Sequence, residues 1–415
     1  MRKALTMLII AVCTAVLVFS GCKGKEGPAL KMMHNKVEID TMLKAYAADW
    51  GTENGVGVTI ISTGGSSDVS LGQQLTADYA AGEMPDIFVI DGPEAYKEWQ
   101  SIILDLSNEP WVANTSVAFT VDGKVYGFPV AVEGWGMAYN ADVLAAADVD
   151  PAGLNNYAAY MEAFEKIDAM KDELGLDSVV SMAASIGMGW VTAHHNFNSL
   201  LSNGLPYGDK SVAEALLAGN IDEQRLSEYA DWVELLFMYA DPAVLTTGDY
   251  DAQVGAFANG KAAFLHQGNW TDPNMAQANV AFKMAFAPHG SMQAVTDGIF
   301  VAAPSFYVIN SESKNVEAAK KFLADMVATE RGNKYMVEEA GMIPAFSNVQ
   351  LSPAGQLSTS VQSWSSMGKV YSWNQYLFTG EFRDNVLAPI YNQFAQKQID
   401  KAQFIELMTQ AFMNL

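Results

Sequence analysis

The chain has 415 residues, with 24 lysines and arginines against 47 aspartates and glutamates, so its formal net charge is −23. Such a charge repels nucleic acid and anionic lipid surfaces, which excludes nucleic-acid binding as the expected function and favours solubility. The length exceeds what one hydrophobic core usually supports, so we expect two lobes.

The N-terminal segment is typical of a secretion signal. Two basic residues precede an apolar run at residues 7–19, which is too short to span a bilayer as a mature helix. Ser-Gly-Cys22 follows and resembles the end of a bacterial lipoprotein signal. We therefore expect residues 1–21 to be removed, Cys22 to carry the lipid and residues 22–28 to form a flexible tether. Ordinary secretion with cleavage nearby is the alternative.

Neither a metal site nor a bound cofactor is expected. The only other cysteine, Cys13, lies within the signal, so the mature chain has no thiol for a disulfide, a nucleophile or a metal site. The adjacent His194 and His195 lack the helical spacing at which two histidines bind one metal, and no third ligand is nearby in the sequence.

The first part of the mature chain has the pattern of an α/β unit. A helix at residues 36–50 precedes a strand at 56–61, and a second helix leads to a strand at 86–90. The two strands are expected to be parallel and joined by a right-handed crossover. Ligands bind at the carboxyl ends of such strands, which makes Ser66 and Asp91 candidates. A polar turn residue is the simpler interpretation of the serine.

The stretch at residues 121–140, VDGKVYGFPVAVEGWGMAYN, combines apolar residues with four glycines and a proline. One central strand does not tolerate so many interruptions, so we expect two short strands joined by a bend. Glu133 lies at that bend, and Trp135, two residues on, is expected to point to the same face. A carboxylate beside an indole suits a polyhydroxylated ligand. A surface hairpin with one exposed acid is the alternative.

Residues 141–290 are expected to be largely helical. In this region Trp190 follows a glycine, which suggests an exposed aromatic platform, and Trp270 stands in a polar turn after a strand. The expected elements are helices at 155–174, 224–239 and 253–259 and a buried strand at 262–265.

The α/β pattern then resumes, with strands near residue 286 and at 299–302. A helix with an apolar face follows, capped by Ser313 or Asn315. Beyond residue 345 the chain is expected to be helical to its end. An α/β unit that is interrupted by a helical region and then resumed implies two lobes crossed more than once, which suits a hinge.

Four blocks of sequence carry a resemblance over nearly the whole mature chain. They are GEMPDIFVIDG at 82–92, DGKVYGFPVAVEGWGMAYN at 122–140, FANGKAAFLHQGNW at 257–270 and NVEAAKKFLADMVATERGNKYMVEEAGMIPA at 315–345. In their order and spacing they resemble family 1 of the extracellular solute-binding proteins, the carbohydrate receptors of ABC importers.

The resemblance implies an α/β fold of the type II periplasmic-binding-protein kind, in which two lobes joined by a multi-strand hinge close on a ligand. It also implies a receptor and not an enzyme. Such a receptor is a monomer outside the cytoplasm, periplasmic or lipid-anchored, that delivers a sugar or oligosaccharide to the permease subunits of the importer. The expected boundaries are 29–131 and 297–342 for lobe 1, 136–292 and 346–415 for lobe 2, and 132–135, 293–296 and 343–345 for the hinge.

The same resemblance assigns roles to individual residues. Asp91 stands where the family has an acid that binds sugar hydroxyls, and Glu133 matches the acid at the first lobe crossing. Trp270 matches an aromatic residue that stacks on a sugar ring. The segment before Asp91 is shorter than in the family's maltose receptor and no arginine follows it, which argues against maltose. Further ligand-binding candidates are Trp190, near a second stacking position, Asn269 and Trp373.

Two other functions remain open on the residues alone. Glu133 and Asp91 could be a carboxylate pair for glycoside cleavage, although the sequence has no nucleophile elbow, metal triad or phosphate loop. Acids beside aromatic rings also hold cations, so the ligand could be a polyamine, a peptide or another solute that is not a sugar.

Overall fold

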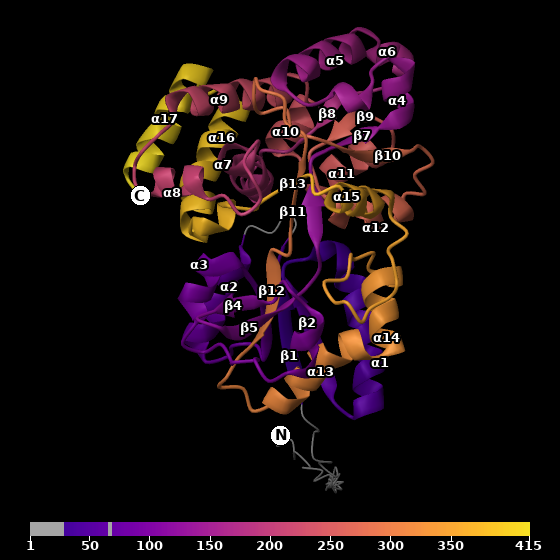
Figure 1. Cartoon of the computed structure of the whole chain (residues 1–415), viewed down its shortest axis with the longest axis vertical. Helices are drawn as coiled ribbons and strands as arrows, with labels where there is room; N and C mark the ends of the chain where they lie inside the picture. The colour runs from indigo at the N-terminus through magenta and orange to yellow at the C-terminus, as the bar shows by residue number, and fades with distance from the viewer. Residues whose placement is uncertain (1–28, 65–68) are drawn as a thin grey trace, which may run out of the picture.

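A computed structural model of the chain describes residues 29–64 and 69–415, which form the two lobes seen in Figure 1. The expected lipidation site Cys22 and the candidate Ser66 lie outside the described residues. Within those residues, no helix combines the length and the apolar character needed to cross a membrane.

The lower lobe in Figure 1 is built on a six-stranded sheet of order β2-β1-β3-β12-β5-β4. Strands β2 and β3 are both parallel to β1, whereas β12 is antiparallel to β3 and to β5. The predicted strands at 56–61 and 86–90 are therefore parallel, but β1, which the sequence analysis does not identify, lies between them. The strands are β1 (Ala29–His34), β2 (Gly57–Ser62), β3 (Ile87–Asp91), β4 (Phe119–Val121), β5 (Lys124–Pro129) and β12 (Ser305–Ile309).

Helices cover both faces of this sheet, so β3 is apolar on both sides. Ile87 and Val89 point into the core beneath α1 and α13, while Phe88 and Ile90 point to the opposite face, beneath α2 and α3. These helices are α1 (Asp40–Asn54), α2 (Leu71–Ala81), α3 (Gly92–Trp99) and α13 (Val316–Ala328), which is followed by α14 (Glu330–Asn333). Neither predicted residue caps α13 with its side chain. The Asn315 Nδ2 group donates to the Ala29 carbonyl, and the Ser313 hydroxyl accepts from the Asn315 backbone amide.

The stretch at residues 121–140 forms three strands in three different sheets, one more than predicted. After β5 come β6 (Glu133–Trp135), in a three-stranded sheet, and β7 (Met137–Asn140), in a four-stranded sheet. Its glycines allow neighbouring elements, α15 (Gln356–Ser366) and β10 (Met284–Ala287), to pack closely against these strands. A Cβ atom at Gly134 would lie 2.7 Å from the Val361 side chain, and one at Gly136 would lie 2.5 Å from the Ala287 carbonyl oxygen.

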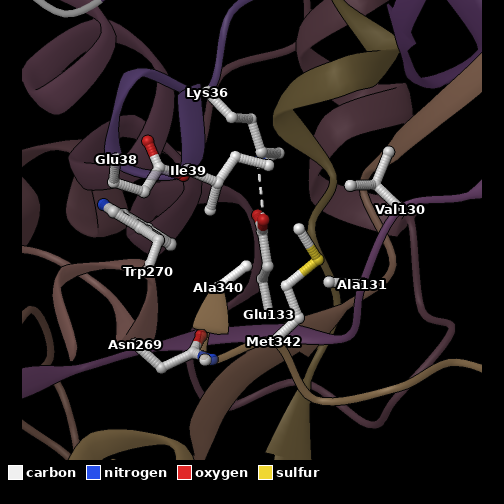
Figure 2. Close-up of a pocket in the computed structure, with 11 residues that line it drawn as sticks. Lys36, Glu38, Ile39, Val130, Ala131, Glu133, Asn269, Trp270, Ala340 and Met342 are labelled. Carbon is white, nitrogen blue, oxygen red and sulfur yellow. Dashed lines mark ion pairs between the residues drawn. The ribbon is translucent and has the colours of Figure 1, made fainter. Parts of the chain in front are cut away.

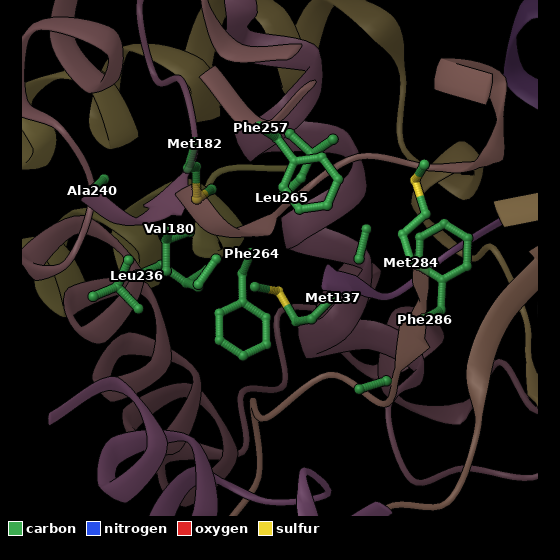
Figure 3. Packing of buried hydrophobic residues seen from close by; sticks show 14 of the residues in the cluster. Met137, Val180, Met182, Leu236, Ala240, Phe257, Phe264, Leu265, Met284 and Phe286 are labelled. Carbon is green, nitrogen blue, oxygen red and sulfur yellow. The ribbon is translucent and has the colours of Figure 1, made fainter. Parts of the chain in front are cut away.

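The upper lobe contains the four-stranded sheet, of order β10-β7-β9-β8, and most of the helices. Figure 3 shows its core, where Met137, Val180 and Phe264 from three adjacent strands pack together. The predicted strand at 262–265 is confirmed as β9. Besides β7, the strands of this sheet are β8 (Ser178–Ser181), β9 (Ala262–Leu265) and β10 (Met284–Ala287).

Helices surround this sheet, as predicted for residues 141–290. They are α4 (Ala141–Ala146), α5 (Tyr157–Ala169), α6 (Lys171–Leu174), α7 (Phe197–Ser202), α8 (Ser211–Leu217), α9 (Glu223–Met238), α10 (Pro242–Thr247), α11 (Tyr250–Ala258), α12 (Asp272–Gln277), α15 (Gln356–Ser366), α16 (Ala388–Ala395) and α17 (Lys401–Met413). Beyond residue 345 the chain is not helical throughout. Between α15 and α16, β13 (Val370–Tyr371) pairs in parallel with β11 (Ile299–Ala302).

The chain passes between the lobes at three places that lie side by side. The first is at residues 130–132, between β5 and β6, and the third is near Ile343. The first and third crossings are joined by a hydrogen bond of 2.9 Å from the Val132 amide to the Ile343 carbonyl. The second is at residues 303–304, between β11 and β12, and not at 293–296 as the sequence analysis expects. There the Val130 amide donates to the Ser305 carbonyl at 3.0 Å.

Candidate ligand-binding site

A pocket lies between the lobes, beside the first and third crossings (Figure 2). It is small in this conformation, and its empty space of about 300 Å³ includes open solvent. Four separate segments line it, so no single motif describes it. The lining residues are Lys36, Glu38, Ile39, Val130, Ala131, Glu133, Asn269, Trp270, Ala340, Gly341 and Met342.

An ion pair between Lys36 and Glu133 spans this pocket. Lys36 follows β1 in the lower lobe and Glu133 begins β6 at the first crossing. The Lys36 Nζ and Glu133 Oε1 atoms are 2.5 Å apart, and the two side chains are only 13% and 7% exposed. Burial by itself lowers the pKa of Lys36, but the carboxylates of Glu133, Glu38 and Asp91 outweigh it and raise that pKa. Lys36 is therefore a fixed positive charge, and the sequence analysis does not identify it.

Glu38 is a second carboxylate in the pocket that the sequence analysis does not identify. It is half-buried in the 3-10 turn Val37–Ile39. Among residues 29–64 and 69–415, no cationic group lies within 4.0 Å of its carboxylate, because Lys36 pairs with Glu133 instead. Burial raises the pKa of Glu38 to about 7, against the effect of nearby Lys36. Near neutral pH this side chain exists in both the charged and the protonated form.

Two neighbours hold the loop that carries Lys36. Burial lowers the pKa of His34 to about 4, so the ring is neutral. Its Nδ1 accepts the Lys36 amide at 3.3 Å, and its Nε2 faces the Asp40 carboxylate at 3.2 Å. Asp91 accepts from the Asn35 amide group at 3.0 Å and from the Ser305 hydroxyl at 2.6 Å. Asp91 does not line the pocket; it supports the loop.

Asn269 joins the pocket to the first crossing. Its Oδ1 accepts from the Gly134 amide at 2.8 Å, and its Nδ2 donates to the Ser358 hydroxyl at 3.1 Å. Both ends of this buried side chain are therefore bound within the protein. Asn269 fixes the position of the following residue, Trp270, against β6.

Trp270 presents an indole to the pocket on the same side as Glu38 (Figure 2). Its Nε1 donates to Gln267 at 2.9 Å. The six-membered part of the ring lies against Gly268, where a Cβ atom would be 2.1–2.5 Å from three ring atoms. The hydrogen bond and the glycine together set the orientation of the indole.

Three other aromatic rings lie near the Trp270 indole. Measured between ring centroids, Trp270 lies 4.9 Å from His195, 6.5 Å from Trp190 and 6.2 Å from Trp373. The structure thus brings together three of the predicted tryptophans, although only Trp270 lines the pocket. Trp190 is half-buried at the start of the π-helical turn Trp190–Asn196 and is not the exposed platform that its sequence suggests.

The structure places Trp135 away from the pocket. This side chain is completely buried and stacks on Phe300, with ring centroids 4.2 Å apart and an angle of 21° between the rings. The β6–β11 register places Phe300 opposite Trp135, and His266 and His289 pack around it. Trp135 belongs to the upper-lobe interior and does not share the pocket with Glu133.

His194 lies between a cation and a carboxylate. Its Nδ1 accepts from Arg383 and its Nε2 donates to Asp384, each at 2.6 Å. Burial and the Arg383 charge lower the pKa of His194, which keeps the ring neutral. Across the described part of the chain, no three His, Cys, Asp or Glu side chains are grouped so that they could hold a metal ion.

The sequence profile of the bacterial extracellular solute-binding protein family matches residues 42–364 of the chain. The chain is also similar to a maltooligosaccharide ABC transporter solute-binding lipoprotein of Streptococcus pneumoniae strain R6. The two are 25% identical over 367 residues, which cover 83% of this chain and 81% of the relative. The corresponding lipoprotein of the TIGR4 strain matches to the same extent.

Several solved structures share the two-lobed fold. The binding protein RafE in complex with raffinose aligns with a TM-score of 0.75 over 93% of this chain and 99% of that one. A Bacillus licheniformis sugar transporter protein in complex with stachyose gives 0.74 over 93% and 99%, and a chitin oligosaccharide binding protein gives 0.74 over 93% and 98%. Each is 18% identical to this chain, so the alignments establish the fold alone.

Proposed function

Because the chain belongs to the bacterial extracellular solute-binding protein family, we propose that it captures a sugar or oligosaccharide between its lobes and delivers it to an ABC importer. The observation that carries the proposal is the pocket between the lobes, which combines an indole with charged groups. The Trp270 ring can cover the apolar face of a sugar, while Lys36, Glu38 and Glu133 can bind its hydroxyls. The related lipoprotein is named for maltooligosaccharide, and the aligned structures hold raffinose and stachyose.

Closure of the lobes completes the site in this proposal. Lys36 and Glu38 belong to the lower lobe, Trp270 belongs to the upper lobe, and Glu133 lies at a crossing between them. Rotation about the three crossings would bring these groups around one ligand and exclude water from it. Trp190 and Trp373 border Trp270 and remain candidates for contacts with a second sugar ring. Nothing in the proposal requires catalysis, and the chain acts as a receptor and not an enzyme.

A thermal-shift screen tests the ligand class. The purified protein is melted with maltotriose, raffinose, stachyose and chitotriose, and in parallel with polyamines and short peptides. A ligand present at one hundred times its dissociation constant stabilises the folded state by about 2.7 kcal/mol, so a saccharide ligand should shift the melt clearly. A shift with polyamines or peptides alone would contradict the sugar assignment, and turnover of a chromogenic glycoside would favour an enzyme.

We also propose that Cys22 carries a lipid that anchors the receptor outside the cytoplasm. The support is the Ser-Gly-Cys22 end of the apolar run and the description of the related proteins as lipoproteins. Cys22→Ser should release the protein from the membrane fraction or leave it unprocessed. A processed Cys22→Ser protein that stays in the membrane fraction would contradict the anchor.

A further inference from the structure

We propose that Glu38 determines which charge class of saccharide the pocket accepts: it binds hydroxyls of neutral sugars and excludes sugars that carry a carboxylate or a phosphate. The inference rests on the proposed function, because it concerns the same pocket. It assigns a specificity-determining role to a residue that no sequence motif identifies.

The position of Glu38 supports this role. Its side chain lines the pocket together with Lys36, Glu133 and Trp270 (Figure 2). Lys36 is bound to Glu133 at 2.5 Å, and over residues 29–64 and 69–415 no cationic group lies within 4.0 Å of the Glu38 carboxylate. The Glu38 carboxylate is therefore the charged group of the pocket that has no ion-pair partner among the described residues.

The charges that line the pocket do not balance. Lys36 carries one positive charge, and Glu38 and Glu133 carry two negative charges, so the lining has a net charge of −1 when all three are ionised. The remaining lining residues are not ionisable. Because Lys36 and Glu133 neutralise each other, the excess charge is that of Glu38. Asp91, close enough to raise the pKa of Lys36, adds to the negative field.

Among the described residues, the elements packed around Glu38 supply no compensating cation within 4.0 Å of its carboxylate. The titratable groups on other elements that feel the Glu38 charge are Tyr250 from α11, Tyr307 from β12 and Tyr335 from the turn Lys334–Glu339. Burial, followed by nearby acids or phenols, raises the pKa of each. These phenols stay neutral at physiological pH. Lys36 and Glu133 are the charged neighbours of Glu38, and their opposite charges cancel each other.

The two ligand classes would act on this carboxylate in opposite ways. Sugar hydroxyls donate hydrogen bonds to a carboxylate, and such charge-assisted bonds are short and strong. A carboxylate or phosphate on the sugar brings a like charge into a partly buried site, which disfavours the charged form of both groups. Since burial already raises the pKa of Glu38 to about 7, hydroxyl donors should lower that pKa and an anionic ligand should raise it further.

Titration calorimetry with matched neutral and oxidised saccharides tests the inference. The probes are maltotriose, raffinose and stachyose, each compared with the same sugar after oxidation of its primary hydroxyls to carboxylates. Glu38→Gln keeps the shape and removes the charge. Glu53→Gln, at an exposed position of α1 in the same lobe, is the control. We expect the wild type to favour the neutral form by about tenfold or more and Glu38→Gln to lose most of that preference. The control should behave as the wild type.

The pH dependence of neutral-sugar binding gives a second readout. Because hydroxyl donors favour the charged carboxylate, affinity should rise between about pH 6 and pH 8 in the wild type and stay level in Glu38→Gln. An unchanged preference for neutral sugars in Glu38→Gln overturns this inference while leaving saccharide binding intact. Failure of the wild type to bind any of the saccharides, neutral or oxidised, overturns the proposed function as well.

Discussion

Removal of the Glu133 charge tests how the pocket is held together without ligand. Glu133→Gln keeps the size of the side chain but leaves the Lys36 ammonium without its partner. The two charges are 2.5 Å apart and largely buried, so at an effective dielectric constant of about 20 they attract by about 7 kcal/mol. Desolvation of both groups offsets much of this gain.

The net loss of folding stability in Glu133→Gln depends on which negative charges remain near Lys36. Loss of one partner from a buried pair typically costs about 3–5 kcal/mol. Glu38 and Asp91 stay close enough to stabilise the Lys36 charge, so we expect Glu133→Gln to lower the free energy of unfolding by about 3 kcal/mol. Lys36→Met in the same background should restore part of the stability, because the double variant contains no unpaired buried charge.

Urea unfolding followed by tryptophan fluorescence measures these changes in Glu133→Gln and in the double variant. The control is Asp168→Asn, which breaks the exposed 3.1 Å pair with Lys171 and should cost less than about 1 kcal/mol. The reasoning is refuted if Glu133→Gln is as stable as the wild type. It is also refuted if the double variant is less stable than Glu133→Gln.

Two further predictions concern Trp270 and His266. Gly268→Ala would place a Cβ atom 2.1–2.5 Å from the Trp270 ring and displace it, so calorimetry should show saccharide affinity weakened by about tenfold or more. Gly72→Ala, with open space around it, should bind normally, and equal binding by both variants would contradict the role of the indole. Burial lowers the pKa of His266 from 6.5 to about 4, so the unfolded chain binds a proton in that window that the folded chain does not. The free energy of unfolding should therefore fall as the pH falls from 6.5 to 4, and it should fall less steeply in His266→Gln. Glu38, whose pKa is raised from 4.5 to about 7, acts in the opposite direction in both proteins. An identical pH slope in both proteins would contradict this origin.

Elements with strong local signals could be predicted from the sequence. The strand at 262–265 is a short apolar run that follows a glycine, and it becomes the fully buried β9. The second predicted helix is α2, and Gly82 after it adopts the left-handed conformation that terminates a helix. β1 was missed because its sequence, ALKMMH, alternates poorly and directly follows the tether.

The pocket could be predicted only in part because it is assembled from distant segments. Lys36 and Glu38 precede α1, and charged residues there have the same local pattern whether they face solvent or a pocket. Their meeting with Glu133 depends on contacts across almost one hundred positions of the chain. Trp135 was assigned to the ligand face by alternation alone, but the strand register places Phe300 over it.

The measurement that tests the central claim most directly compares saccharide binding by Trp270→Ala with binding by the wild type. Calorimetric titration uses whichever saccharide of the thermal-shift panel stabilises the wild type most. The control is Trp364→Ala, because Trp364 lies on α15, outside the pocket, and donates to the Phe286 carbonyl at 3.0 Å. If the sugar binds between the lobes, Trp270→Ala should weaken binding by about tenfold or more, a loss of about 1.4 kcal/mol, while Trp364→Ala should bind as the wild type does. Equal affinity of Trp270→Ala and the wild type would contradict the assignment of the site.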